Sequence, residues 1–388
     1  MKMKTPLLLS YAFRPFFLLN GIFAILIMLL WVMTLHGKGL PAVTPLWHAH
    51  EMLIGFALAA VAGFSLTAVA NWTRRPAVHG AALGWLVFSW LLGRLAMLLS
   101  GSLPPSLIAI LDMLFPLTLC LLLGREVISG GSKRNYQLVA ILAALVVFNV
   151  LYHLGVSQLL VNADRTAIYL IIHSVLLLVI IIAGRIVPNF TANWLRQQGY
   201  TRMPINSMGV NRLALILTVL TGLAASLFPA HPVTGILAFA AALVHGLRLS
   251  RWQGMATRSN PLLFILHAAY AWVPIGYALM GFGIFGWVFT ATSALHALTM
   301  GAIGGIILAV TTRVGLGHTG RPLVATRATV AAYWIFMLAA AVRVLGPVIG
   351  PVSGKGYMRV LDLAATGWIL AFAIFVWVYW PILTRPRN

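Results

Sequence analysis

Twelve long apolar runs limit what this chain can fold into. They cover residues 16–35, 47–71, 81–99, 107–128, 138–156, 166–187, 208–228, 233–249, 261–280, 283–310, 325–348 and 359–383. A run of about 20 residues, at a rise of about 1.5 Å per residue, crosses the hydrocarbon core of a bilayer as a helix. We therefore predict an all-α polytopic membrane protein with twelve transmembrane helices, forming a single integral membrane domain over residues 1–388.

The charged residues support this count. Only 8% of the 388 residues are charged, which is too few to build a water-facing surface. If the N-terminus is cytoplasmic, 20 of the 26 lysines and arginines lie at the cytoplasmic ends of the runs. Both termini are therefore predicted to be cytoplasmic. Because the basic residues lie at run ends rather than on one face, the lipid bilayer is the expected partner, and nucleic acid is not.

Several chemistries are excluded by what the chain lacks. Its single cysteine, Cys120, cannot form an internal disulfide or a thiolate cluster. The sequence has no glycine-rich loop ending in Lys-Ser/Thr, so the protein is not expected to hydrolyse ATP. Three carboxylates are candidates for a position inside the membrane: Glu51, Asp112 and Asp362. That number is small for a carrier coupled to protons or sodium.

Histidines in several runs are the best candidates for metal ligands. Neutral imidazole tolerates a low dielectric and donates a lone pair to iron, copper or zinc. Five of the eleven histidines are predicted jointly as ligands of a metal or haem: His48, His50, His173, His267 and His296. For each one taken alone, a hydrogen-bonded packing role is the alternative.

The stretch "PLWHAHEMLIGF", residues 45–56, holds three ionisable groups within four positions. Helical spacing puts His48 and Glu51 on one face and His50 roughly 200° away. We interpret these residues as the outer end of a cofactor pocket, with Glu51 accepting a hydrogen bond that orients an imidazole. The alternative is that they cap and hydrate the start of a helix.

Short matches suggest weak internal similarity between residues 1–200 and 201–388. His-Ala-x-x-Met occurs at residues 48–52 and again at 296–300. With the tenth run beginning at residue 283, His296 is expected about thirteen residues deep. The glycines of "MGAIGGIILA" would let a neighbouring helix or a flat macrocycle approach the backbone closely.

Five arginines lie within or beside the runs: Arg14, Arg94, Arg185, Arg313 and Arg343. Their guanidinium groups can extend to the lipid headgroups. The alternative is that some of them pair with the propionates of a haem, since the planar guanidinium suits a carboxylate.

Five blocks of the sequence resemble the NnrS family. They are "SYAFRPFFLL" (10–19), "WHAHEMLIGFALAAVAGFSLTAVANW" (47–72), "GRIVPNFTAN" (184–193), "HAAYAWVP" (267–274) and "HALTMGAIGGIILAVTTRVGLGHTGRPL" (296–323). The resemblance implies a bacterial inner-membrane protein that contains haem, of b type, with copper as a further metal. It also implies a role in denitrification and in the response to nitric oxide, a small diatomic ligand. Residues of these blocks inherit a cofactor-binding role, including Arg313 and, less directly, His173.

Twelve runs with histidines on the second, sixth and tenth are also similar to the core of haem-copper oxidases and nitric oxide reductases. Those proteins carry a His-x-His pair on span ten, whereas this chain has its pair on span two. A single haem held by His48 or His50 together with His296 fits this chain better than a complete two-haem centre with copper.

Three functions follow from these observations. The first is a membrane haem protein that binds nitric oxide or protects cellular iron from it. The second is a transporter of a metal, haem or small molecule, with helices broken near Pro188, Pro229 and Pro274. The third is an oxidoreductase that turns over nitric oxide. The residues alone do not decide whether the protein is an enzyme.

Overall fold

A computed structural model describes residues 6–350 and 353–386 of the chain. Lys2, Lys4 and Arg387, which enter the charge count, lie outside the described residues. The described part is helical and contains no strand. The predicted all-α class is therefore confirmed.

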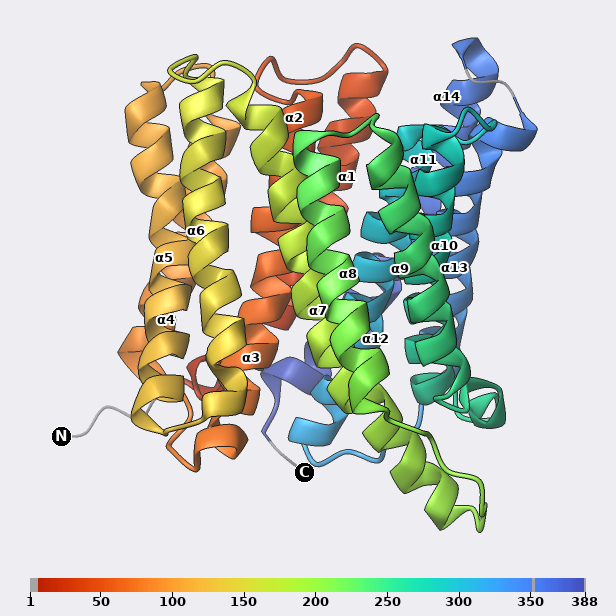
Figure 1. The fold of residues 1–388 in the computed structure, drawn as a ribbon. Coiled ribbons are helices and arrows are strands. Elements are labelled where there is room, and N and C mark those ends of the chain that lie inside the picture. The colour runs from red at the N-terminus through yellow and green to blue at the C-terminus, as the bar shows by residue number, and fades with distance from the viewer. Residues whose placement is uncertain (1–5, 351–352, 387–388) are drawn as a thin grey trace, which may run out of the picture. The chain divides into compact units, whose positions relative to one another are not determined.

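Long helices follow one another along the chain, with a few short helical turns between them (Figure 1). The α-helices are α1 (Phe13–Leu35), α2 (Pro45–His50), α3 (Leu58–Thr73), α4 (Gly80–Leu98), α5 (Pro105–Ser129), α6 (Tyr136–Val156), α7 (Ala163–Gln197), α8 (Met208–Leu227), α9 (Pro232–Ser250), α10 (Pro261–Ile284), α11 (Ala291–His296), α12 (Gly305–His318), α13 (Arg327–Ile349) and α14 (Gly354–Thr384). The 3₁₀ turns are η1 (Leu7–Leu9), η3 (Lys133–Asn135) and η4 (Gly254–Thr257), and two π-helical segments are η2 (Glu51–Ala57) and η5 (Ala297–Gly304).

Twelve of the resulting helices within the described residues are long and apolar enough to cross a membrane. This confirms the predicted count, and the chain is a multi-pass membrane protein. The second, sixth and tenth spans are the most enclosed, with 83%, 78% and 83% of their most apolar window buried. The other nine spans have between 33% and 61% buried. Four of the five histidines predicted as metal ligands lie on these enclosed spans: His48, His50, His173 and His296.

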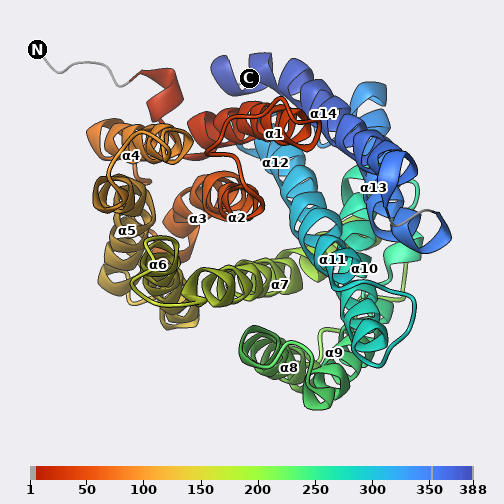
Figure 2. The ribbon, with the colours of Figure 1, turned by 90° about the horizontal axis from the view of Figure 1, so that it is seen from above.

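The helices divide into two compact units. Unit 1 comprises Met1–Ser174, Arg313–Pro322 and Phe375–Asn388, and unit 2 comprises Val175–Thr312 and Leu323–Ile374. In unit 1, α5 packs between α4 and α6, and in unit 2, α9 packs between α8 and α10 (Figure 2). The units are not contiguous halves of the chain, since α7, α12 and α14 each contribute to both.

The first and last transmembrane helices meet at one end of unit 1. The guanidinium of Arg14, at the start of α1, donates to the carbonyl oxygens of Leu383 and Arg385 at 2.7 and 2.8 Å. Arg14 therefore satisfies carbonyls at the end of α14 rather than extending to lipid headgroups. An even number of spans places the start of the first helix and the end of the last helix on the same side, in agreement with this contact. Which side faces the cytoplasm stays a prediction.

The second and tenth spans share an unusual backbone plan. Each begins with a threonine whose side chain caps the helix, Thr44 for α2 and Thr290 for α11. Each then runs as a short α-helix ending at a histidine and continues as a π-helical segment. A π-helical turn inserts an extra residue into the helix and is often found at functional sites. The second and tenth spans therefore share a backbone plan as well as a short sequence match.

The structure aligns the two spans in a different register from the His-Ala-x-x-Met match. His50 and His296 each lie six residues after the capping threonine and directly before the π-helical segment. Gly55 and Gly301 each lie five residues further on. The counterpart of His296 is therefore His50, and not His48.

The tenth span begins later than predicted. It starts at Ala291, because α10 continues to Ile284 and the chain then turns through Gly286, which has a φ of +85°. This left-handed conformation suits glycine and ends the helix. His296 consequently lies six residues into its span instead of about thirteen, so the predicted depth is wrong.

The prolines do not break the helices as a transporter would need. Pro188 lies inside α7 and Pro274 inside α10, both continuous helices, and Pro229 lies in the turn between α8 and α9. Membrane helices tolerate proline because neighbouring groups satisfy the freed carbonyl.

The glycines of η5 and α12 make room for neighbouring side chains of unit 2. A Cβ atom on Gly301 would collide with Trp272, and one on Gly304 would collide with Trp368. Of the two uses predicted for these glycines, the structure shows close packing against other helices.

Candidate functional site

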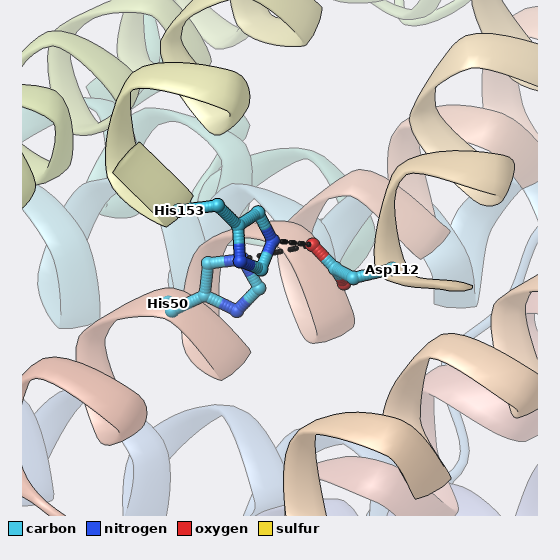
Figure 3. A group of neighbouring side chains, drawn as sticks. All are labelled: His50, Asp112 and His153. Atoms are coloured by element: carbon cyan, nitrogen blue, oxygen red, sulfur yellow. Dashed lines mark hydrogen bonds and ion pairs between the residues drawn. The ribbon is translucent and has the colours of Figure 1, made fainter. Parts of the chain in front are cut away.

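A buried cluster of polar side chains connects four spans of unit 1. Its six members are His50, Glu51, Arg94, Asp112, Asn149 and His153. They come from the α2–η2 junction, α4, α5 and α6. None has a side chain more than 9% exposed. Figure 3 shows three of them, with both imidazoles directed at the carboxylate of Asp112.

Arg94 links the two carboxylates of this cluster. Its Nη1 donates to Glu51 Oε1 and its Nη2 donates to Asp112 Oδ1. Buried charges in a membrane protein are costly unless they are paired, so each of these groups depends on the others. Arg94 therefore pairs with acidic side chains of its own unit, and the predicted alternatives of lipid headgroups and haem propionates do not describe it.

The remaining carboxylate oxygen of Asp112 faces α6 and the end of α2. It accepts hydrogen bonds from His153 Nε2 at 2.9 Å and from Asn149 Nδ2 at 2.7 Å, and His50 Nε2 lies 3.3 Å away. Asn149 Oδ1 in turn accepts from His50 Nε2 at 2.9 Å. Asp112 Oδ2 thus lies close to two imidazoles and one amide group.

His50 is oriented by its neighbour in sequence. Its Nδ1 donates to Glu51 Oε1 at 2.9 Å, which directs Nε2 toward Asp112. Helical spacing had paired Glu51 with His48 instead. The difference arises because the π-helical segment begins at Glu51 and because Arg94 holds the carboxylate beside His50. Glu51 does orient an imidazole, as predicted, but that of the other histidine.

Two glycines let the helices come close enough for these contacts. A Cβ atom on Gly93 would lie 3.2 Å from the Cα atom of Asp112, so α4 and α5 are in backbone contact next to Arg94. A Cβ atom on Gly55 would lie 3.1 Å from Nη1 of Arg94. Small residues at such crossings are typical of membrane helix packing.

A pocket of about 380 Å³ reaches the cluster from one end of unit 1. It lies between the loops that follow α1, α4 and α6, at the end that the charge distribution predicts to be outside. Its wall includes Trp47, Met97, Ile108, Tyr152 and His153. His153 is therefore the member of the cluster that a small molecule in the pocket could contact.

Unit 2 contains a buried polar group of different character. His245 Nδ1 lies 2.7 Å from the hydroxyl of Tyr270, and its Nε2 lies 3.0 Å from Thr218 Oγ1. Arg248 donates to the same tyrosine hydroxyl at 2.9 Å and to Asn211 Oδ1 at 2.7 Å. All the partners are neutral, and this group resembles a hydrogen-bonded packing network.

The other predicted residues of unit 1 lie apart from this charged cluster. His48 is half-buried and stacks on Trp31, with ring centroids 4.5 Å apart. His173 is buried, and its Nδ1 donates to the carbonyl of Tyr169 at 2.9 Å. Arg313 is half-buried in α12. Of the predicted site residues, only His50 and Glu51 belong to the charged cluster.

The two predicted histidines of unit 2 also have assigned bonds. His267 is buried, and its Nε2 lies 2.9 Å from Thr191 Oγ1. His296 is half-buried, and its Nδ1 donates to the carbonyl of Thr292 at 2.8 Å. This last bond is the same i−4 bond that His173 makes.

Sequence reasoning missed Asn149 as a site residue and left His153 undecided. A signal was present, because these residues are four apart in an otherwise apolar α6 and therefore share one face. Polar residues at that spacing in a membrane span indicate a common partner. The partner, Asp112, lies on another helix, so the sequence did not identify it.

The chain matches one known protein family over almost its whole length. A family model described as NnrS protein matches residues 7–387. The chain belongs to the NnrS family. No curated protein matches this NnrS-family chain.

Among solved structures, this NnrS-family chain is similar to a haem-copper terminal oxidase dimer determined by cryo-electron microscopy. The TM-score is 0.66 at 16% sequence identity, and the match covers 98% of this chain and 86% of that chain. At this identity the likeness shows the fold. The predicted similarity to the haem-copper oxidase core is confirmed at the level of architecture.

Proposed function

We propose that this NnrS-family protein is a haem protein of the bacterial inner membrane that binds nitric oxide and limits nitric oxide stress. The family and the oxidase-like fold support haem as the cofactor. Copper remains part of the family expectation. Both termini are proposed to be cytoplasmic, on the distribution of lysine and arginine.

The observation that carries haem binding is the state of His173. Because its Nδ1–H donates to the Tyr169 carbonyl, Nε2 carries the lone pair. That Nε2 atom is buried and has no hydrogen-bond partner among the described residues. A buried polar atom without a partner is costly, and an iron ion is a partner that would satisfy it. His173 is therefore the residue that we propose would hold the haem iron.

Three further histidines remain candidates. His296 is retained from the sequence prediction, and its Nδ1 donates to the Thr292 carbonyl. His267 has a buried Nδ1 without a hydrogen-bond partner among the described residues. His48 is retained from the sequence prediction and stacks on Trp31.

A bound haem would supply an iron atom that takes a diatomic ligand. The chain itself supplies the imidazole and a surrounding of apolar side chains that excludes water. Residues adjoining His173, such as Ile171, Ile172 and Val175, are buried and aliphatic. Nitric oxide is a small apolar gas that enters a lipid phase, so a site within the spans suits it.

Optical spectroscopy of the purified, full-length protein tests this function. We expect a Soret band, one that shifts when nitric oxide is added to the ferrous protein. His173→Ala should lose the haem, whereas His79→Ala should keep it, because His79 is exposed and its Nδ1 bonds the nearby Ala77 carbonyl. Absence of a Soret band with and without added haem would end the proposal, and full haem content in His173→Ala would reassign the ligand.

A second candidate is an oxidoreductase that consumes nitric oxide, which the oxidase-like fold favours. Anaerobic nitric oxide consumption in the presence of a reductant separates the two. Stoichiometric binding without turnover supports the binding protein, and sustained consumption supports the enzyme.

A further inference from the structure

We propose that His50, Asp112 and His153 form a second, non-haem site for a divalent first-row transition metal, open toward the pocket at one end of unit 1. The site is independent of the haem proposal. It uses none of the atoms proposed to hold iron at His173.

The donor set fits such a metal. His50 Nε2, His153 Nε2 and one Asp112 oxygen all lie within 4.8 Å of one another, and among the described residues no other group of three His, Cys, Asp or Glu side chains is so placed. The two nitrogen atoms lie 3.3 and 2.9 Å from Asp112 Oδ2. Ligands at about 2.0–2.1 Å from a tetrahedral metal are roughly 3.3 Å apart, so little rearrangement is needed. Two imidazoles and a carboxylate suit zinc, copper or iron.

Glu51 orients one of the histidine ligands of this site, as carboxylates beside metal ligands commonly do. Histidine ligands commonly donate their second ring N–H to a carboxylate, which fixes the ring and its tautomer. His50 does so, because its Nδ1 donates to Glu51 Oε1 while its Nε2 faces Asp112. Arg94 in turn holds Asp112 by Oδ1 and leaves Oδ2 for the metal.

Charge and unmet bonding also point to a cation. With neutral imidazoles, the two carboxylates and Arg94 leave the buried cluster with one net negative charge. Glu51 Oε2 is buried and lacks a hydrogen-bond partner among the described residues. A buried group of this kind is costly without a compensating positive charge.

Without a metal, protons must take its place. His50 Nδ1 faces a carboxylate oxygen and its Nε2 faces the amide oxygen of Asn149, so both nitrogens must carry a proton. A metal at Nε2 displaces that proton, and binding therefore releases protons to the solvent. Replacing this proton by a divalent ion would turn the net charge of the cluster from 0 to +1. A hydroxide or other small anion would restore neutrality. The pocket beside His153 gives such an anion a route to the metal.

Zinc titration of the full-length protein, purified in detergent and stripped with a chelator, tests the site. We expect one zinc ion per chain by metal analysis, with proton release seen as a buffer-dependent heat in calorimetry. His153→Gln and Asp112→Asn should lose this stoichiometric binding. Glu51→Gln should weaken it by about 10- to 100-fold, because it acts through His50.

The matched control is His79→Gln, which removes an exposed histidine and should leave zinc binding unchanged. Helix content by circular dichroism confirms that each variant is folded. If Asp112→Asn does not fold, His153→Gln decides, since that side chain lies on the pocket wall. Zinc well below one per chain in the unaltered protein, or equal zinc in His153→Gln, would overturn the site. The haem spectrum is read separately, so either proposal can fail alone.

Discussion

The second and tenth spans have the same backbone plan and different chemistry. In each, a threonine caps a short α-helix that ends at a histidine and passes into a π-helical segment. The residue that follows the histidine is Glu51 in one span and Ala297 in the other. Glu51 bonds His50 and Arg94, whereas Ala297 is buried in an apolar part of unit 2.

This difference shows which level of structure determines the chemistry. In both units the capping threonine and the π-helical segment set the position of the histidine along its span. The carboxylate next to His50 and the charged residues of α4 and α5 then turn one histidine into part of an ionic cluster. His296 Nδ1, by contrast, donates to the backbone carbonyl of Thr292 in its own helix.

Exchanging the two residues should produce the largest effect. Glu51→Ala leaves Arg94 with one carboxylate and His50 Nδ1 without its acceptor, which should cost about 3–5 kcal/mol. Ala297→Glu places a carboxylate at a fully buried position next to the buried Leu298, and should cost several kcal/mol. Unfolding of the detergent-solubilised variants, followed by circular dichroism, measures both.

Ala297→Leu separates charge from volume in this exchange, because it adds a comparable side chain without a charge. It should cost about 1–3 kcal/mol, as overpacking does. If Ala297→Glu is no worse than Ala297→Leu, the contrast between the two spans is not electrostatic.

The sequence predicted the spans because apolarity over about 20 residues is a local property. It also predicted that Glu51 would orient an imidazole. The regular 3.6-residue spacing placed Glu51 on the face of His48, because it was assumed to continue through residue 51, where the π-helical segment begins. The start of the tenth span was misplaced for a related reason, since the glycine-rich stretch 281–286 reads as apolar although the chain turns there.

The charged cluster could not be assembled from the sequence. Arg94 and Asp112 were each recognised as ionisable groups within spans, but their pairing depends on the approach of α4 and α5 at Gly93. That approach depends on tertiary packing. Asn149 shows the same limit, because its role is defined by His50 and Asp112, which lie on two other helices.

The glycines of the π-helical segments offer a second way to compare the spans. Gly55→Ala would press against the ring tip of Phe23, and Gly301→Ala against the inner ring atoms and Cβ of Trp272. The outer atoms of a side-chain ring can move away more easily than the atoms next to the backbone. We expect about 1 kcal/mol for Gly55→Ala and about 3 kcal/mol for Gly301→Ala, within the range for overpacking.

Gly246→Ala is the matched control for these variants. It lies in α9 with nothing within 4 Å of the added carbon, so it should be neutral or stabilising by up to about 1 kcal/mol. Equal losses for Gly55→Ala and Gly301→Ala would contradict the difference in packing.

The capping threonines should give the smallest effect, and the same one in both spans. Thr44 Oγ1 accepts from Trp47 N at 3.1 Å, and Thr290 Oγ1 accepts from Ser293 N at 3.0 Å. Replacing either by alanine should cost about 1 kcal/mol, because one helix N–H loses its acceptor. Thr44→Ser and Thr290→Ser keep the hydroxyl and should be near neutral. Thr44 also lines the neighbouring pocket. A markedly larger loss of stability for Thr44→Ala than for Thr290→Ala would mean that Thr44 also stabilises the pocket wall. The two spans would then differ already at their capping residues.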